Sequence, residues 1–182
     1  PTSYHLVALS GGRNIAQLAR DALEFSPEVV VTAFEDLLPE LQAAMAGSGV
    51  AVQAGAEAIA RAAERPADWI MSCIVGVAGL TPSLKAVQQG ATLALANKES
   101  LVAAGPILMA EARRHGATIL PVDSEHSAIF QALVGEDMAA VERIILTASG
   151  GALRDWPLDR LASATMAEAL APPNWLMGAR IT

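Results

Sequence analysis

The sequence has few aromatic side chains, one cysteine and no long apolar run. Aromatic residues make up only 4% of the chain, so alanine, leucine, valine and isoleucine must build the core. A single cysteine excludes an intrachain disulfide framework and suits a reducing cytoplasm. Cys73 lies inside an apolar run and is interpreted as a small buried side chain. No apolar run approaches the roughly 20 residues of a membrane-spanning helix, so no membrane segment is expected.

The chain also has no basic stripe. Its net charge is −7, and acidic and basic residues are interspersed, which argues against a nucleic-acid-binding surface. Binding of an anionic ligand would therefore need a local positive pocket. The chain begins at Pro1 without an initiator methionine and ends without a helix cap or polar tail. We therefore expect it to be an internal fragment of a longer protein.

Short apolar runs alternate with amphipathic segments through the first two thirds of the chain. Strands are predicted at Tyr4–Leu9, Glu28–Val31, Val50–Gln53, Trp69–Ile74, Thr92–Leu95 and Thr118–Pro121. Helices are predicted near Asn14–Phe25, Glu35–Ala46, Ala56–Glu64, Leu80–Gln89 and Leu101–His115. This alternation predicts an α/β fold with a doubly wound, mostly parallel sheet of the Rossmann-like type. The phosphate-binding pattern G-x-G-x-x-G is absent, so the first βα unit of such a fold is expected to be missing.

The pattern changes after Pro121, where we place a domain boundary between residues 122 and 123. A helix at Ser124–Leu133 and a strand at Val141–Thr147 are predicted next. Short helices are predicted at Leu158–Ala162 and Thr165–Leu170. We expect residues 123–182 to be part of an α+β domain.

Polar residues follow three of the predicted strands, where ligands sit in doubly wound sheets. Arg13 follows the first strand, where an arginine suits the 2′-phosphate of NADP, although a solvated loop arginine is the more ordinary interpretation of this position taken alone. The stretch Asn97–Ser100 follows the fifth strand. It is interpreted either as a ligand-binding site or as a helix cap followed by solvated charged residues.

The segment Asp123-Ser124-Glu125-His126 follows the sixth predicted strand and allows two interpretations. If it is extended, Asp123 and Glu125 point to the same side and offer hard oxygen ligands for Mg²⁺ or Mn²⁺. Otherwise Asp123 or Ser124 caps a helix and Glu125 lies in its first turn. His126 is either a third ligand or, as we expect, a helix residue that is hydrogen-bonded beside the site.

These segments occur together in the order typical of one family. The strings Leu95–Val102, Leu120–Gln131 and Ile145–Gly151, together with Gly12-Arg13-Asn14, strongly resemble the 1-deoxy-D-xylulose 5-phosphate reductoisomerase family. The resemblance covers nearly the whole chain. It implies an NADPH- and divalent-metal-dependent conversion of 1-deoxy-D-xylulose 5-phosphate to 2-C-methyl-D-erythritol 4-phosphate in non-mevalonate isoprenoid biosynthesis. It also implies a sugar phosphate substrate, a cytoplasmic location, a homodimer, and Mg²⁺ or Mn²⁺, with Co²⁺ as a further option.

The resemblance also implies residue roles. The positions that match NADPH contacts are Gly12, Arg13, Asn14, Asn97, Glu99 and Gly178. Those that match substrate contacts are Lys98, Ser124, Glu125 and Ser149. Asp123 and Glu125 match two of three carboxylate metal ligands, and Lys98 and Glu125 are the expected catalytic residues. Residues 1–122 are then part of the NADPH-binding domain, and residues 123–182 are part of the catalytic, metal-binding domain.

Several positions depart from the family pattern, among them Ala152 and Leu153, which stand where the family has Pro-Phe. Pro172 stands where the family has a substrate-contacting histidine, and Leu176 replaces a serine of a mobile loop. These departures favour an alternative in which the chain is a catalytically inactive fragment or paralogue that acts as a binding module. A different NADP-dependent dehydrogenase, such as a homoserine dehydrogenase, is a further alternative, but the paired acids Asp123 and Glu125 count against it. We expect no turnover from these 182 residues alone.

Overall fold

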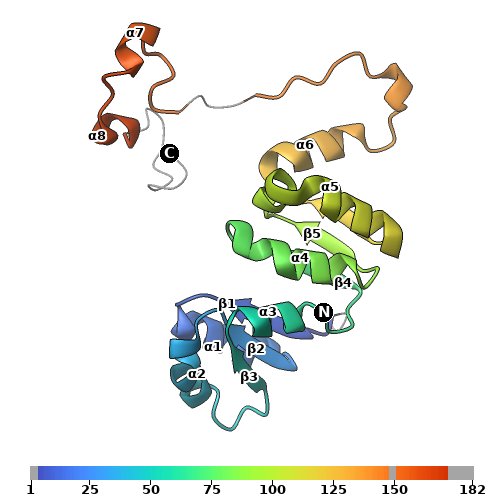
Figure 1. Ribbon diagram of the computed structural model, residues 1–182. Coiled ribbons are helices and arrows are strands. Elements are labelled where there is room, and N and C mark those ends of the chain that lie inside the picture. The colour runs from blue at the N-terminus through green and yellow to red at the C-terminus, as the bar shows by residue number, and fades with distance from the viewer. Residues whose placement is uncertain (1–3, 148–150, 172–182) are drawn as a thin grey trace. The chain divides into compact units, whose positions relative to one another are not determined.

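A computed structural model describes residues 4–147 and 151–171 of the chain (Figure 1). The chain divides into two compact units, the first ending at Gly135 and the second beginning at Glu136. The strands are β1 Ala8–Gly11, β2 Val29–Thr32, β3 Ala51–Ala54, β4 Trp69–Ser72, β5 Thr92–Leu95 and β6 Thr118–Pro121. The helices of the first unit are α1 Ile15–Phe25, α2 Leu38–Ala44, α3 Ala56–Ala62, α4 Leu80–Val87, α5 Lys98–His115 and α6 Ser124–Leu133. Single 3₁₀ turns precede α2 at Glu35–Leu37 and α4 at Val77–Gly79.

The first half of this unit is a three-stranded parallel sheet with helices on both faces. Its strand order is β1-β2-β3. Along β2, Val30 packs against α1 and α2, whereas Val29 and Val31 pack against α3. All three valines are buried because β2 is the central strand and both of its faces are covered.

The second half is another parallel sheet, of order β4-β5-β6. Leu93 and Leu95 of β5 pack against α4 and α5, which also bury Val87 and Leu108. The helix α5 contains a non-helical residue at Ala104, shortly before Pro106. A proline inside a helix removes one backbone hydrogen bond and crowds the preceding turn, which accounts for this kink.

The α/β class with parallel, two-sided packing is confirmed. Two strands, β5 and β6, and the helix α6 have the predicted ends. The first strand is β1 at Ala8–Gly11 rather than Tyr4–Leu9, because the aromatic side chain of Tyr4 is 94% exposed and joins no core. The domain boundary after residue 122 stays a prediction. In the structure α6 lies against β6 within the first unit (Figure 1).

Two expectations are wrong. Val141–Thr147 forms no strand, and Ile145 and Leu146 within it are largely exposed. An extended segment forms a strand only where a partner accepts its backbone hydrogen bonds, and the described residues offer it none. Cys73 is exposed rather than buried. It follows Trp69 and Met71 at alternating positions on an edge strand, and both of these side chains are also about half exposed.

The second unit contains short helices. They are the 3₁₀ turn Met138–Ala140, α7 Leu158–Leu161 and α8 Met166–Ala169. Thr165 and Glu168 form a reciprocal capping box at the start of α8. Nowhere in residues 4–147 and 151–171 is a helix long and apolar enough to cross a lipid bilayer.

Candidate functional site

The carboxyl ends of β5 and β6 bring two helix N-termini together. The two strands are parallel neighbours, and Leu95 pairs with Pro121 in their register. Two residues beyond each of these positions, Asn97 caps α5 and Asp123 caps α6 through their side-chain oxygens. Short polar side chains that accept from the first helical N–H groups are preferred at such positions. The register of the sheet therefore places both caps at one edge.

Lys98 and Glu125 are joined at this edge. Lys98 is the first residue of α5, Glu125 is the second residue of α6, and Lys98 Nζ lies 3.3 Å from Glu125 Oε2. The pKa of the Glu125 carboxyl lies below its usual value because its own backbone N–H and the Ser124 hydroxyl hydrogen-bond to it. Lys98 lowers the same pKa further through its hydrogen bond and its charge. Two predicted catalytic residues are thus in contact, and Glu125 is ionised at neutral pH.

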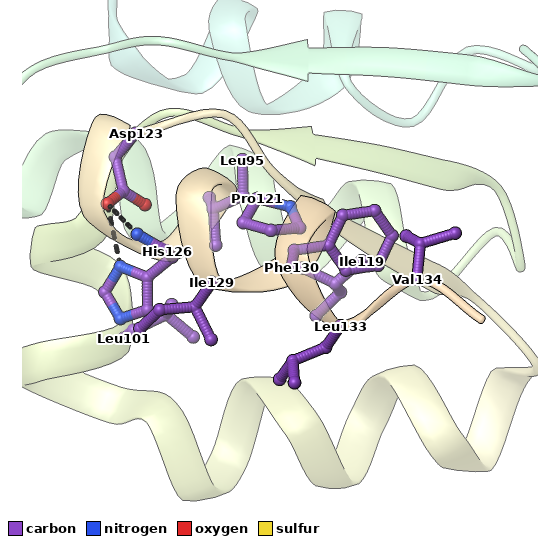
Figure 2. Close-up of a pocket in the computed structure, with 10 residues that line it drawn as sticks. All are labelled: Leu95, Leu101, Ile119, Pro121, Asp123, His126, Ile129, Phe130, Leu133 and Val134. Atoms are coloured by element: carbon purple, nitrogen blue, oxygen red, sulfur yellow. Dashed lines mark hydrogen bonds and ion pairs between the residues drawn. The ribbon is translucent and has the colours of Figure 1, made fainter. Parts of the chain in front are cut away.

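Asp123 is held by His126, one helical turn along. One carboxylate oxygen, Oδ1, accepts from the backbone N–H of His126 at 3.1 Å and lies 2.8 Å from its ring Nδ1 (Figure 2). The Asp123 side chain is only 8% exposed. Burial raises the pKa of Asp123, but the hydrogen bonds from His126 and the charges of His126 and Lys98 outweigh burial, so this pKa is lower than usual. Asp123 is therefore a fixed, ionised carboxylate.

An apolar pocket adjoins Asp123. It has a volume of about 380 Å³, and the polar groups lining it, Asp123 and His126, lie together at one end (Figure 2). Its other lining residues are Leu95, Leu101, Ile119, Pro121, Ile129, Phe130, Leu133 and Val134. A phosphate group needs cations and several hydrogen-bond donors, whereas this lining offers only the His126 ring, which already pairs with the Asp123 carboxylate. We therefore do not assign this pocket to an anionic ligand.

Asn97 is buried and its side-chain amide is fully used within the protein. Its oxygen accepts from the backbone N–H and the hydroxyl of Ser100, each at 2.7 Å. Its nitrogen donates to the carbonyls of Ile74 and Gly76, the latter at 2.8 Å. An asparagine amide offers two donors and one oxygen with two lone pairs, so all four are taken. The side chain therefore ties the loop after β4 to the start of α5.

The loop after β4 is fixed from its other end as well. The buried hydroxyls of Ser72 and Ser83 lie 2.7 Å apart, and Ser83 also donates to the Gly79 carbonyl. Gly79 packs so closely that a Cβ would overlap the Asn97 amide and lie 2.7 Å from the Ile74 carbonyl oxygen. Only glycine fits at this position.

The predicted cofactor residues Gly12, Arg13 and Asn14 lie at the carboxyl end of β1. Asn14 caps α1 by accepting from the Gln17 backbone N–H at 3.1 Å. The exposed Arg13 guanidinium stacks on the Phe34 ring, with its central carbon 3.8 Å from the ring centroid. The structure therefore places an exposed cation beside a helix N-terminus, a combination that suits a phosphate.

For the other predicted site residues that it describes, the structure gives a position but no contact that indicates a role. Ser124 and Glu99 lie in the first turns of α6 and α5, and Glu99 is exposed. Ser149 and Gly178 lie outside the described residues, as do Pro172 and Leu176. Within the described ranges, no three of the histidine, cysteine, aspartate and glutamate side chains are grouped as a metal site. The pair Asp123 and Glu125 therefore stays a prediction as metal ligands.

Sequence reasoning missed the residues that surround Arg13. Phe34 and Asp36 follow β2, the strand beside β1, and both contact Arg13. The same strand-end rule that selected Arg13, Asn97 and Asp123 could have found them, because parallel neighbours end at one edge. The partners of Asn97 in the loop after β4 gave no comparable signal.

Comparison with known families gives two matches. Residues 1–105 match the model described as 1-deoxy-D-xylulose 5-phosphate reductoisomerase, and residues 119–182 match that of its C-terminal domain. A protein of that name from Jannaschia sp. (strain CCS1) is 69% identical over all 182 residues, which cover 46% of its length. One from Ruegeria pomeroyi is 66% identical, again with 46% of its length covered. The chain thus spans less than half the length of the curated relatives it matches.

Similar solved structures carry the same protein name as these relatives. The chain is similar to a 1-deoxy-D-xylulose 5-phosphate reductoisomerase from Zymomonas mobilis in complex with NADPH, with a TM-score of 0.88 and 45% identity. That match covers 93% of this chain and 45% of the other. A DOX-P reductoisomerase in complex with NADPH, fosmidomycin and magnesium matches with a TM-score of 0.83 and 36% identity, over all of this chain and 47% of the other.

Proposed function

Because the chain belongs to the 1-deoxy-D-xylulose 5-phosphate reductoisomerase family, we propose that it forms part of an enzyme with that activity. The enzyme would convert 1-deoxy-D-xylulose 5-phosphate to 2-C-methyl-D-erythritol 4-phosphate in non-mevalonate isoprenoid biosynthesis, as an NADP-dependent oxidoreductase and isomerase. The observation that supports this most is the contact of Lys98 with Glu125 beside the fixed carboxylate of Asp123. It joins a cation and two anions at the carboxyl edge of a parallel sheet.

We assign NADPH to the residues at the ends of β1 and β5. Arg13 carries an exposed positive charge, and Asn14 begins a helix whose N-terminus also favours negative charge. These groups fit a 2′-phosphate. Gly12 leaves the backbone of this turn without a Cβ, and Glu99 lies in the first turn of α5, after the end of β5. Asn97 would serve the cofactor by shaping the loop after β4, because its amide is fully occupied.

We assign a divalent cation, Mg²⁺ or Mn²⁺ with Co²⁺ as a further option, to Asp123 and Glu125. The donor set fits, because both groups are ionised carboxylates and hard cations prefer oxygen ligands. Both hydrogen bonds from His126 go to Oδ1 of Asp123, so Oδ2 faces no competition from His126. When bound, the metal polarises substrate oxygens as a Lewis acid and NADPH supplies hydride.

The remaining work falls to the protein's own side chains. Lys98 and Ser124 hold the substrate's oxygens as donors, and Lys98 stabilises negative charge that develops on them. Glu125 and Asp123 orient the site through contacts already made to Lys98 and His126. Ser149 and Gly178 complete the proposed substrate and NADPH contacts.

We also propose a cytoplasmic homodimer. The single cysteine, Cys73, is free and exposed, and an exposed thiol is kept reduced in the cytoplasm. The family resemblance supports the dimer. Its subunits would each carry one substrate site.

The test is substrate-dependent oxidation of NADPH by the full-length protein with Mg²⁺ or Mn²⁺. We expect turnover, and we expect Arg13→Ala to raise the KM for NADPH about tenfold through loss of a charge-assisted contact. Full-length protein that binds NADPH and Mn²⁺ but turns over no substrate would support the inactive binding module instead. An unchanged KM in the variant would remove Arg13 from the cofactor site.

A further inference from the structure

The turn that carries Arg13 is fastened to the segment after β2. The hydroxyl of Thr32, a fully buried residue, donates to the Gly12 carbonyl at 3.1 Å. The same hydroxyl accepts from the Phe34 backbone N–H at 3.3 Å. One buried side chain thus fixes both segments relative to each other. The contacts of Arg13 with the second segment are therefore formed between two backbone segments that are held in place.

Arg13 has two partners on that segment. Its guanidinium stacks on the Phe34 ring at 3.8 Å, and its Nη1 lies 3.4 Å from Asp36 Oδ2. The Arg13 and Asp36 side chains are 62% and 65% exposed. An exposed ion pair is weak, so Asp36 can exchange Arg13 for another partner at little cost. The stacking on Phe34 keeps the guanidinium in place when that happens.

These two charged groups favour different cofactors. In doubly wound sheets, an acid near the strand ends accepts hydrogen bonds from the ribose hydroxyls of NAD, whereas an arginine there binds the 2′-phosphate of NADP. Here Arg13 and Asp36 occupy the same place. A 2′-phosphate that binds Arg13 also lies close to the negatively charged carboxylate of Asp36, because Asp36 contacts the same guanidinium. The two negative charges repel each other.

We propose that Asp36 is a cofactor-specificity residue, which accepts the ribose hydroxyls of NADH and opposes the 2′-phosphate of NADPH. This inference rests on the proposed binding of the dinucleotide at Arg13. Arg13, held by Phe34, supplies the attraction for the 2′-phosphate, and Asp36 limits the resulting preference. The protein therefore binds NADH measurably, and removal of one carboxylate sharpens its choice of NADPH.

The experiment measures dissociation constants of NADPH and NADH for the full-length protein by calorimetric titration, without substrate or metal. Asp36→Asn keeps the size of the side chain and removes its charge. We expect this variant to bind NADPH about threefold to tenfold more tightly and NADH more weakly by a similar factor, as expected for one exposed charge. Adenosine 2′-phosphate, used alone as a probe, should follow NADPH.

Glu24→Gln is the matched control. Glu24 is exposed near the far end of α1, about 15 Å along the helix from its N-terminus, so the same loss of charge should leave both constants unchanged. If Arg13→Gln weakens NADPH binding but Asp36→Asn leaves the ratio of the two constants within about twofold, the role of Asp36 is refuted and the proposed cofactor site stands. If Arg13→Gln changes neither constant, the cofactor assignment and this inference both fail.

Discussion

The ammonium nitrogen of Lys98 lies 3.3 Å from a carboxylate oxygen of Glu125, although the two residues are 27 positions apart in the sequence. Each lies in the first turn of a helix that follows a strand, and the two strands are parallel neighbours. The pair is about half exposed, so its value for stability is small. Its importance lies in position, because it holds a cation and an acid at the edge where ligands bind in doubly wound sheets.

Lys98→Ala in the full-length protein should lower kcat about 10²-fold or more, because a donor aimed at developing negative charge is lost. NADPH affinity should change little, because Lys98 is assigned to the substrate and its ammonium group pairs with Glu125. Steady-state kinetics and calorimetric titration measure the two effects. Lys85→Ala is the control. Lys85 lies near the C-terminal end of α4 and also pairs with a glutamate, Glu64, at 2.7 Å, but it is not a proposed site residue. Equal losses of kcat in both variants would contradict a specific role for Lys98.

Asn97→Ala should destabilise the protein by about 2–4 kcal/mol, because it leaves the half-buried carbonyls of Ile74 and Gly76 and the buried Ser100 N–H without their side-chain partner. Asn97→Asp should cost at least as much, since a carboxylate cannot donate to those carbonyls. Urea denaturation measures both. Gln88→Ala, at an exposed amide, should change stability by less than about 0.5 kcal/mol. A stable Asn97→Asp variant would refute the donor role.

Gly79→Ala should destabilise the protein by about 1–3 kcal/mol, because the new Cβ would overlap the Asn97 amide and lie 2.7 Å from the Ile74 carbonyl oxygen. The control is Gly105→Ala in α5, where a Cβ meets Leu101 Cβ at an ordinary 3.9 Å. That substitution should be neutral or stabilising, because alanine favours helix over glycine. Thermal unfolding compares the two, and similar shifts in Tm would show that the close packing at Gly79 is not the cause.

Asp123→Ala should cost about 1 kcal/mol of stability through loss of the cap of α6, whereas Asp123→Asn should retain most of it. Both variants should bind Mn²⁺ more weakly than the wild type, because each removes an anionic oxygen ligand. Chemical denaturation and electron paramagnetic resonance of Mn²⁺ separate the two roles. Undiminished Mn²⁺ binding in Asp123→Asn would remove Asp123 from the metal site.

The pH dependence of the Asp123→Asn variant adds a second test. The folded protein holds the pKa of Asp123 below its usual value of 3.8, so the ionised carboxylate contributes stability above that value. This contribution is lost as the pH falls through the lower folded pKa. The stability difference between the wild type and Asp123→Asn should therefore shrink below about pH 4. A difference that grows on acidification would contradict the sign of this shift.

The sequence predicted the local structure well where one signal dominated. Apolar runs predicted β5 and β6 with their observed ends, and the interpretation of Asp123 as a helix cap holds. Prediction failed at Val141–Thr147, whose apolar residues resemble a strand but have no partner among the described strands. It also failed at Cys73, because an apolar run does not tell a central strand from an edge strand.

The sequence by itself determined the alternation of strands and helices, the caps and the family resemblance, since each depends on residues a few positions apart. The tertiary structure alone decided that Asn97 is fully bonded to the loop after β4, that Lys98 meets Glu125, and that Phe34 and Asp36 flank Arg13. These contacts join segments separated by more than 20 residues. They exist because parallel strands in register end at the same edge, and the pattern of a single segment does not carry that register.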